Sequence, residues 1–94
     1  MDIIRLEDGR AAEIVEEWTE TVGWNGRNNI GRYSRDQWSG ADLGLTRTGC
    51  WVLMHRSARQ GSRPWNEEIS PEQAAGWFAA CGIELPEALR SVVV

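Results

Sequence analysis

One stretch, "DLGLTRTGCWVLMHR" (residues 42–56), constrains the fold more than any other part of the chain. Apolar residues alternate with others on both sides of Thr48-Gly49, and a glycine between two such runs is typical of a tight turn. Successive side chains of a β-strand point to opposite faces of the sheet. The pattern therefore predicts an antiparallel hairpin with strands at residues 42–47 and 50–56.

A two-residue turn at Thr48-Gly49 fixes which residues of the two strands lie opposite one another. On this register, four apolar side chains share one face of the hairpin: Leu43, Leu45, Val52 and Met54. Cys50 lies at the end of that face, and Asp42 lies opposite His55 on the other face. Cys50 and His55 then point in opposite directions, which argues against a cysteine–histidine nucleophile pair.

The start of the chain is compatible with two structures. Asp8-Gly9 lies between apolar stretches and favours a hairpin, with Ile3 opposite Ile14. Five apolar residues instead recur at a spacing typical of a helix: Ala11, Ile14, Val15, Trp18 and Val22. We expect the hairpin, although the pattern over residues 10–22 fits either a strand or a helix.

A helix over residues 71–81 is the best-supported element. Ser70 and Gln73 have the spacing of a capping box, Pro71 suits the first helical position, and Gly82 suits the end. Four residues form one apolar stripe along the helix: Ala74, Trp77, Phe78 and Cys81. Because Cys81 belongs to this stripe, we expect it to be a buried, structural cysteine.

We predict that residues 1–94 form a single small domain of the α+β class, because a chain of 94 residues makes one domain at most. It should have an antiparallel sheet of about four to five strands, with the helix at about 71–81 packed on one face. An exposed strand edge would allow a homodimer. No apolar segment is long enough to span a membrane, and no signal peptide is evident, so we expect a cytoplasmic protein.

Charge is distributed unevenly along the chain. Residues 1–20 carry seven acids and two arginines, residues 21–63 carry seven arginines and two acids, and residues 64–94 carry five acids and one arginine. The basic middle either presents a charged face to partners or pairs with acids of the same chain. The acids considered for such pairing are Glu13, Glu16, Glu17 and Glu20.

The sequence contains few residues in arrangements that are typical of catalytic or metal-binding sites. One histidine and two cysteines, Cys50 and Cys81, do not make a closed zinc site, and no phosphate-binding or dinucleotide motif is present. Asp42 and His55 are the one titratable pair, and a cross-strand ion pair explains them without catalysis. We therefore expect no enzyme activity, no catalytic residues, no metal and no cofactor.

Tryptophan and arginine are the residues most enriched in interface hot spots, and they meet in the basic loop after the central hairpin. The partner-binding residues that we predict are Arg56, Arg59, Arg63 and Trp65. An alternative is a nucleic-acid-binding module, because arginines and aromatic rings are interleaved over residues 24–65. A sequence pI near 4.9 favours a protein partner or a nucleoprotein over free nucleic acid.

The runs "LGLTRTGCWVL", "QGS" and "ISPEQAAGWF" resemble a pattern in small uncharacterised proteins of phages and plasmids. The resemblance covers about residues 42–82, and the chain departs from it at Gly44, where a larger side chain is usual. It implies a β-meander with a packed helix. It also implies a small protein that inhibits or regulates a macromolecular partner, such as an anti-defence protein of a mobile genetic element.

Overall fold

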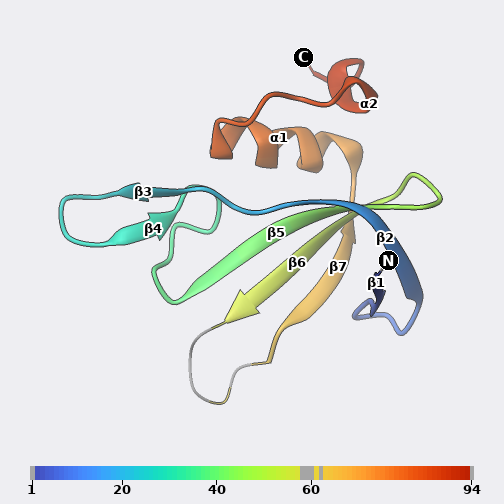
Figure 1. The fold of residues 1–94 in the computed structure, drawn as a ribbon, viewed down its shortest axis with the longest axis horizontal. Coiled ribbons are helices and arrows are strands. Elements are labelled where there is room, and N and C mark those ends of the chain that lie inside the picture. The colour runs from blue at the N-terminus through green and yellow to red at the C-terminus, as the bar shows by residue number, and fades with distance from the viewer. Residues whose placement is uncertain (1, 58–60, 62, 94) are drawn as a thin grey trace.

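Five antiparallel strands form one curled sheet, and a helix packs on one of its faces (Figure 1). This computed structural model describes residues 2–57, 61 and 63–93. The strands of the sheet follow the order β1 (Asp2–Arg5), β2 (Ala11–Trp18), β5 (Ser39–Thr46), β6 (Trp51–Ser57) and β7 (Trp65–Ile69). The remaining elements are the two-stranded sheet of β3 (Val22–Trp24) and β4 (Asn29–Gly31), and the helices α1 (Pro71–Cys81) and α2 (Glu87–Arg90). The predicted α+β class is confirmed.

The hairpin between β5 and β6 closes with a three-residue turn rather than the predicted two-residue turn. The Thr46 N–H donates to the Cys50 carbonyl at 2.8 Å, and the Gly49 N–H donates to the Thr46 carbonyl at 3.0 Å. Gly49 has a φ of 90°, whereas Thr48 is not among the residues with positive φ. A two-residue turn of the kind favoured in hairpins would need positive φ at both central positions, so the loop is a type I turn closed by a glycine bulge.

The additional turn residue changes the pairing of β5 with β6 by one position. The observed partners are Leu45 with Trp51, Leu43 with Leu53, Asp42 with Met54 and Ala41 with His55. A one-residue change of register reverses the faces of one strand relative to the other. The predicted apolar face is therefore wrong in its β6 half, and the predicted pairing of Asp42 with His55 is also wrong.

The first hairpin has the same kind of turn. The Leu6 N–H donates to the Arg10 carbonyl at 2.8 Å, and Gly9 has a φ of 93°. Ile3 consequently pairs with Glu13 instead of the predicted Ile14. Residues 11–18 are a strand, as expected from the hairpin interpretation.

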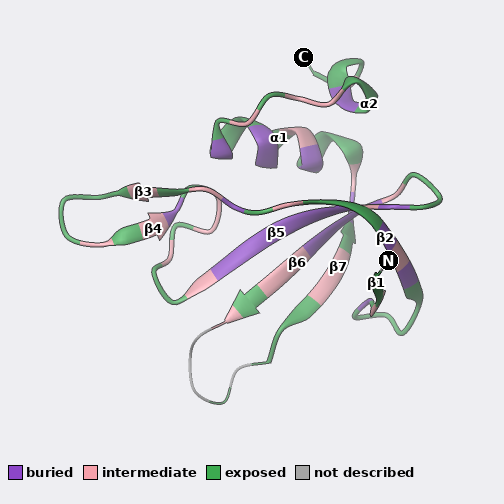
Figure 2. Ribbon diagram, in the orientation of Figure 1, coloured by how far each residue is buried: buried purple, intermediate pink, exposed green. Residues whose placement is uncertain are grey.

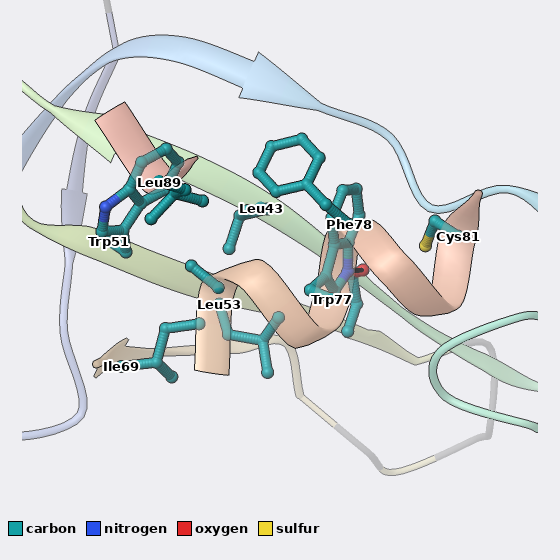
Figure 3. Close-up of a cluster of buried hydrophobic side chains, with 10 residues drawn as sticks. Leu43, Trp51, Leu53, Ile69, Trp77, Phe78, Cys81 and Leu89 are labelled. Carbon is teal, nitrogen blue, oxygen red and sulfur yellow. Dashed lines mark hydrogen bonds between the residues drawn. The ribbon is translucent and has the colours of Figure 1, made fainter. Parts of the chain in front are cut away.

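The sheet has an apolar core on each face, and β5 at its centre is buried along most of its length (Figure 2). The side chains between the sheet and the helices, eight of them labelled in Figure 3, are Ala41, Leu43, Trp51, Leu53, Ile69, Ala74, Trp77, Phe78, Cys81 and Leu89. The smaller core, inside the curl of the sheet, consists of Leu6, Ala12, Ile14 and Val52, with Ile4 and Met54 packed against it. Both faces of the central strands are buried, which explains why β6 is apolar along most of its length.

A bulge at Val15 lets β2 contribute to both cores. Ile14 pairs with Thr46, but Glu16 already pairs with Leu45, so Val15 is the additional residue. Ile14 points into the smaller core, whereas Trp18 lies 5.1 Å from the Phe78 ring on the helix side. Residues four apart on a regular strand share a face, so it is this bulge that puts Ile14 and Trp18 on opposite faces of the sheet.

Helix α1 begins and ends as the sequence predicts. Ser70 and Gln73 form both hydrogen bonds of the capping box, and Gly82 ends the helix with a φ of 67°. All four residues of the predicted apolar stripe are buried. The Trp77 Nε1–H donates to the Ala41 carbonyl at 2.8 Å, which ties the helix to β5.

Substitution of the turn glycine should destabilise the protein through backbone strain alone. A Cβ atom at Gly49 would meet no atom within 4 Å, but the residue has positive φ. Gly49→Ala should therefore lower the free energy of unfolding by about 1–2 kcal/mol. Gly76→Ala is the matched control: it also meets no atom, lies within α1, and should stabilise the protein by about 0.5–1 kcal/mol. Urea denaturation measures both, and equal effects would contradict the assigned turn.

Candidate functional site

A cavity of about 380 Å³ opens at the end of the sheet where β5 and β7 begin and β6 ends. Three of the four predicted partner-binding residues line it: Arg56, Arg63 and Trp65. Arg59 lies outside the described residues. The structure therefore brings together every predicted site residue that it describes.

One wall of the cavity is a stacked pair of rings. His55 and Trp65 are partners across β6 and β7, and their rings stack at 3.9 Å with an interplanar angle of 8°. His55 Nε2 lies 2.6 Å from Glu67 Oε2, so the imidazole is held from two directions. On the face of β7 that carries the stack, Ile69 is 8% exposed and Trp65 is 43% exposed. The stack thus lies on the part of the sheet that the helix leaves open.

Arg56 forms an ion pair with Asp42. Its Nε and Nη2 atoms donate to the two carboxylate oxygens of Asp42 at 2.9 Å and 3.0 Å. The guanidinium lies against Gly40, where a Cβ atom would fall 2.5 Å from Nη2. Arg56 therefore has a structural role in addition to lining the cavity, because a buried glycine and a carboxylate hold it in place.

Arg63 differs from Arg56 in having no such partner. It is exposed, and within residues 2–57, 61 and 63–93 no acceptor pairs with its side chain. Its guanidinium is free to take a planar anionic group such as a carboxylate. Arg63 lies two positions before Trp65, the first residue of β7, and both residues line the cavity.

The opposite wall of the cavity depends on a buried carboxylate that sequence reasoning missed. Glu20 is 5% exposed and accepts hydrogen bonds from the backbone N–H groups of Tyr33 at 2.8 Å, Ser34 at 2.5 Å and Ala41 at 2.9 Å. Ser34 also donates to it through Oγ at 3.2 Å. Glu20 thereby fixes the irregular segment 32–38 against β5.

Of the two alternatives for the basic middle, pairing with acids of the N-terminal region is limited, among the described residues, to Glu13 with Arg47. Glu20 binds backbone amides rather than an arginine, and Glu16 and Glu17 are exposed without an ion pair in the described part of the chain. Glu13 Oε2 lies 3.7 Å from Arg47 Nη1, so the two residues form an ion pair, but this oxygen accepts no hydrogen bond. Sequence alone did not distinguish Glu20 from Glu16 and Glu17, since all three are acids near the end of one strand.

The cavity brings no nucleophile and base together. His55 hydrogen-bonds Glu67 and, among the described residues, no serine or cysteine. Cys81 is buried under the helix, and Cys50 lies at the other end of β6. In the same part of the chain, no group of three or more His, Cys, Asp and Glu side chains is placed to hold a metal ion.

No family model matches this chain, and comparisons with curated proteins and with solved structures give no match. Within the described ranges, no helix has the length and apolar character needed to cross a membrane.

Loss of the Glu20 carboxylate should destabilise the protein strongly. Glu20→Ala leaves three backbone N–H groups without their acceptor, at about 1–3 kcal/mol each, so we expect a loss of at least about 3 kcal/mol. Glu20→Gln keeps one acceptor oxygen and should lose about half as much. The exposed Glu17→Ala is the control and should change stability by less than about 0.5 kcal/mol. Thermal and urea unfolding measure all three, and equal effects of Glu20→Ala and Glu17→Ala would contradict the role of Glu20.

Proposed function

We propose that this chain is a non-enzymatic binding protein that holds an acidic segment of a macromolecular partner in the cavity at the end of the sheet. The observation that carries the proposal is the combination of Arg63, whose side chain has no acceptor among the described residues, with the half-exposed ring of Trp65. Trp65 lies on the part of the sheet that α1 leaves uncovered, and Arg63 lies just before it in the chain.

The two residues suit complementary parts of such a segment. Trp65 offers a large flat surface that is already ordered by His55, so binding costs little side-chain entropy. Arg63 offers a bidentate donor for a carboxylate. Arg56 contributes less, because Asp42 already satisfies two of its donors.

The regulatory part of the proposal is that binding inhibits or modulates the partner. It is supported by the resemblance of residues 42–82 to small uncharacterised proteins of phages and plasmids, because small proteins of such elements, anti-defence proteins among them, act by binding a host or competing system. That resemblance rests on turn, strand and helix motifs, so the partner is specified here only by its acidic chemistry.

Removal of both side chains tests the proposed site. Arg63→Ala with Trp65→Ala should lower the recovery of the partner from host lysate at least about tenfold, because each truncation at a hot spot costs about 1–2 kcal/mol or more. An acidic peptide, such as polyglutamate, provides a direct titration with the same variants. The expected result is that both assays lose binding together.

A second arginine–tryptophan pair serves as the matched control. Arg27 and Trp24 are also exposed and lie near the β3–β4 turn, away from the cavity. Arg27→Ala with Trp24→Ala should retain the partner. Equal recovery by the wild type and by the Arg63, Trp65 variant would refute the cavity as the binding site.

Nucleic acid is the second candidate ligand, and the exposure of three tryptophans favours it. Trp24, Trp38 and Trp65 are 67%, 52% and 43% exposed, and exposed arginines lie near them. Bases stack on such rings, and phosphates bind the arginines. Fluorescence anisotropy with a single-stranded oligonucleotide decides: binding at low salt that falls steeply with rising salt supports this candidate, and no binding at low salt removes it.

A further inference from the structure

β7 is an edge strand of the sheet, since β6 alone of the described strands forms a ladder with it. The Thr46 N–H donates to the Cys50 carbonyl, and bonded pairs recur at every second residue of an antiparallel ladder. The backbone of Val52 therefore bonds to β5, whereas the backbone of His55 bonds to β7. It follows that His55 and Trp65, which are cross-strand partners, exchange both of their backbone hydrogen bonds.

Trp65 is consequently flanked by two backbone groups that point away from the sheet. No peptide bond between described residues is cis, and in a trans peptide the C=O and the N–H point in opposite directions. Because the N–H and the C=O of Trp65 both point to β6, the Pro64 carbonyl and the Asn66 N–H point to the open edge. Among residues 2–57, 61 and 63–93, no group hydrogen-bonds to either of them.

Contacts with the first hairpin close the edge of β7 from Asn66 onward. The Asn66 carbonyl accepts from the Glu7 N–H at 2.8 Å, which confirms that the Asn66 backbone faces the edge. The Asn66 side chain donates through Nδ2 to the Arg5 carbonyl at 3.0 Å. Pro64 and Trp65, in contrast, are exposed. The part of the edge that remains open is therefore the part beside Trp65, where β7 reaches the cavity.

The two free groups match one residue of a strand that runs parallel to β7. Such a residue, lying beside Trp65, donates its N–H to the Pro64 carbonyl and accepts from the Asn66 N–H. A bonded antiparallel pair would need the Asn66 carbonyl, which already accepts from Glu7, or an N–H at Pro64, which proline lacks. We infer that the acidic segment of the partner binds as an added strand parallel to β7, an inference that rests on the proposed function.

The direction of the added strand determines which of its side chains meet Arg63 and Trp65. Alternate residues of a strand share a face, and Pro64 favours an extended Arg63 two positions before Trp65. The segment therefore carries an apolar residue beside Trp65 and an acidic residue two positions earlier, beside Arg63. Two positions later it lies beside Glu67, which binds His55 and repels a second acid. The ligand is thus an extended segment in which the acid precedes the apolar residue.

Two capped peptides of equal composition and opposite order test the direction of the strand. The peptide STETVTS has its glutamate two positions before its valine, and the peptide STVTETS has the reverse order. Titration followed by nuclear magnetic resonance should show that STETVTS binds at least about fivefold more tightly, because the reverse order replaces attraction at Arg63 by repulsion at Glu67. Equal affinities, or a preference for STVTETS as an antiparallel strand requires, would overturn the inference.

Amide hydrogen exchange of the wild-type protein locates the new backbone bond. The Asn66 amide should exchange at least about tenfold more slowly when STETVTS is bound, because it then has an acceptor. The Glu67 amide is the internal reference, since it already bonds to β6 and should change little. An Asn66 amide that stays unprotected, or protection on β1 in its place, would overturn the inference.

Removal of the Asn66 N–H gives an independent test. Asn66→Pro loses this donor, and Asn66→Ala is the matched control because both variants lose the bond to Arg5. Proline is tolerated on an edge strand, and circular dichroism checks that both variants are folded. Asn66→Pro should bind STETVTS at least about threefold more weakly than Asn66→Ala. Equal affinities of the two folded variants would contradict the added strand.

Failure of this inference is distinguishable from failure of the proposed function. Wild-type binding of polyglutamate that is lost in the Arg63→Ala, Trp65→Ala variant, without binding of STETVTS or protection of Asn66, would leave the binding site in place and overturn the added strand. If the wild type binds neither polyglutamate nor STETVTS, both the proposed function and the inference that rests on it are overturned.

Discussion

The glycine-bulge turn between Thr46 and Cys50 is the constraint on which the rest of the structure depends. It decides that Leu43 lies opposite Leu53, and therefore which side chains of β6 face the helix. If the register of β6 shifted by one residue, Val52 would turn away from the smaller core and His55 would turn away from the cavity. A single backbone conformation at Gly49 thus determines both the main core and the position of the candidate site.

The same register divides the sheet into a covered half and an open half. Trp51 and Leu53, at the start of β6, are buried beneath α1, whereas His55, near its end, stacks on Trp65 beyond the helix. The open half is not loose, because Glu20 fixes the facing segment through backbone amides. The protein therefore presents Trp65 on a paired strand, stacked on His55 and facing a fixed segment, which limits the entropic cost of binding at that ring.

The sequence predicted the elements whose signals are local. The helix after Ser70 has its cap, stripe and terminator within a dozen residues, and all of them are observed. Register could not be predicted, because Thr48-Gly49 fits a two-residue turn and a three-residue turn equally well by composition. The role of Glu20 could not be predicted from the sequence either, because the amides that it binds lie 13–21 residues further along the chain. Three site residues were predicted together because Arg63 and Trp65 are close in sequence and Arg56 lies near the end of the neighbouring strand.

The measurement that tests this account most directly is a nuclear Overhauser spectrum of the β5–β6 hairpin. In the observed register Leu43 and Leu53 form a pair without mutual hydrogen bonds, whose Cα atoms lie about 4.5 Å apart. We predict a strong cross-peak between the Hα atoms of Leu43 and Leu53. A strong Hα cross-peak between Gly44 and Leu53 in its place, which a two-residue turn requires, would contradict the core, the cavity and the site together.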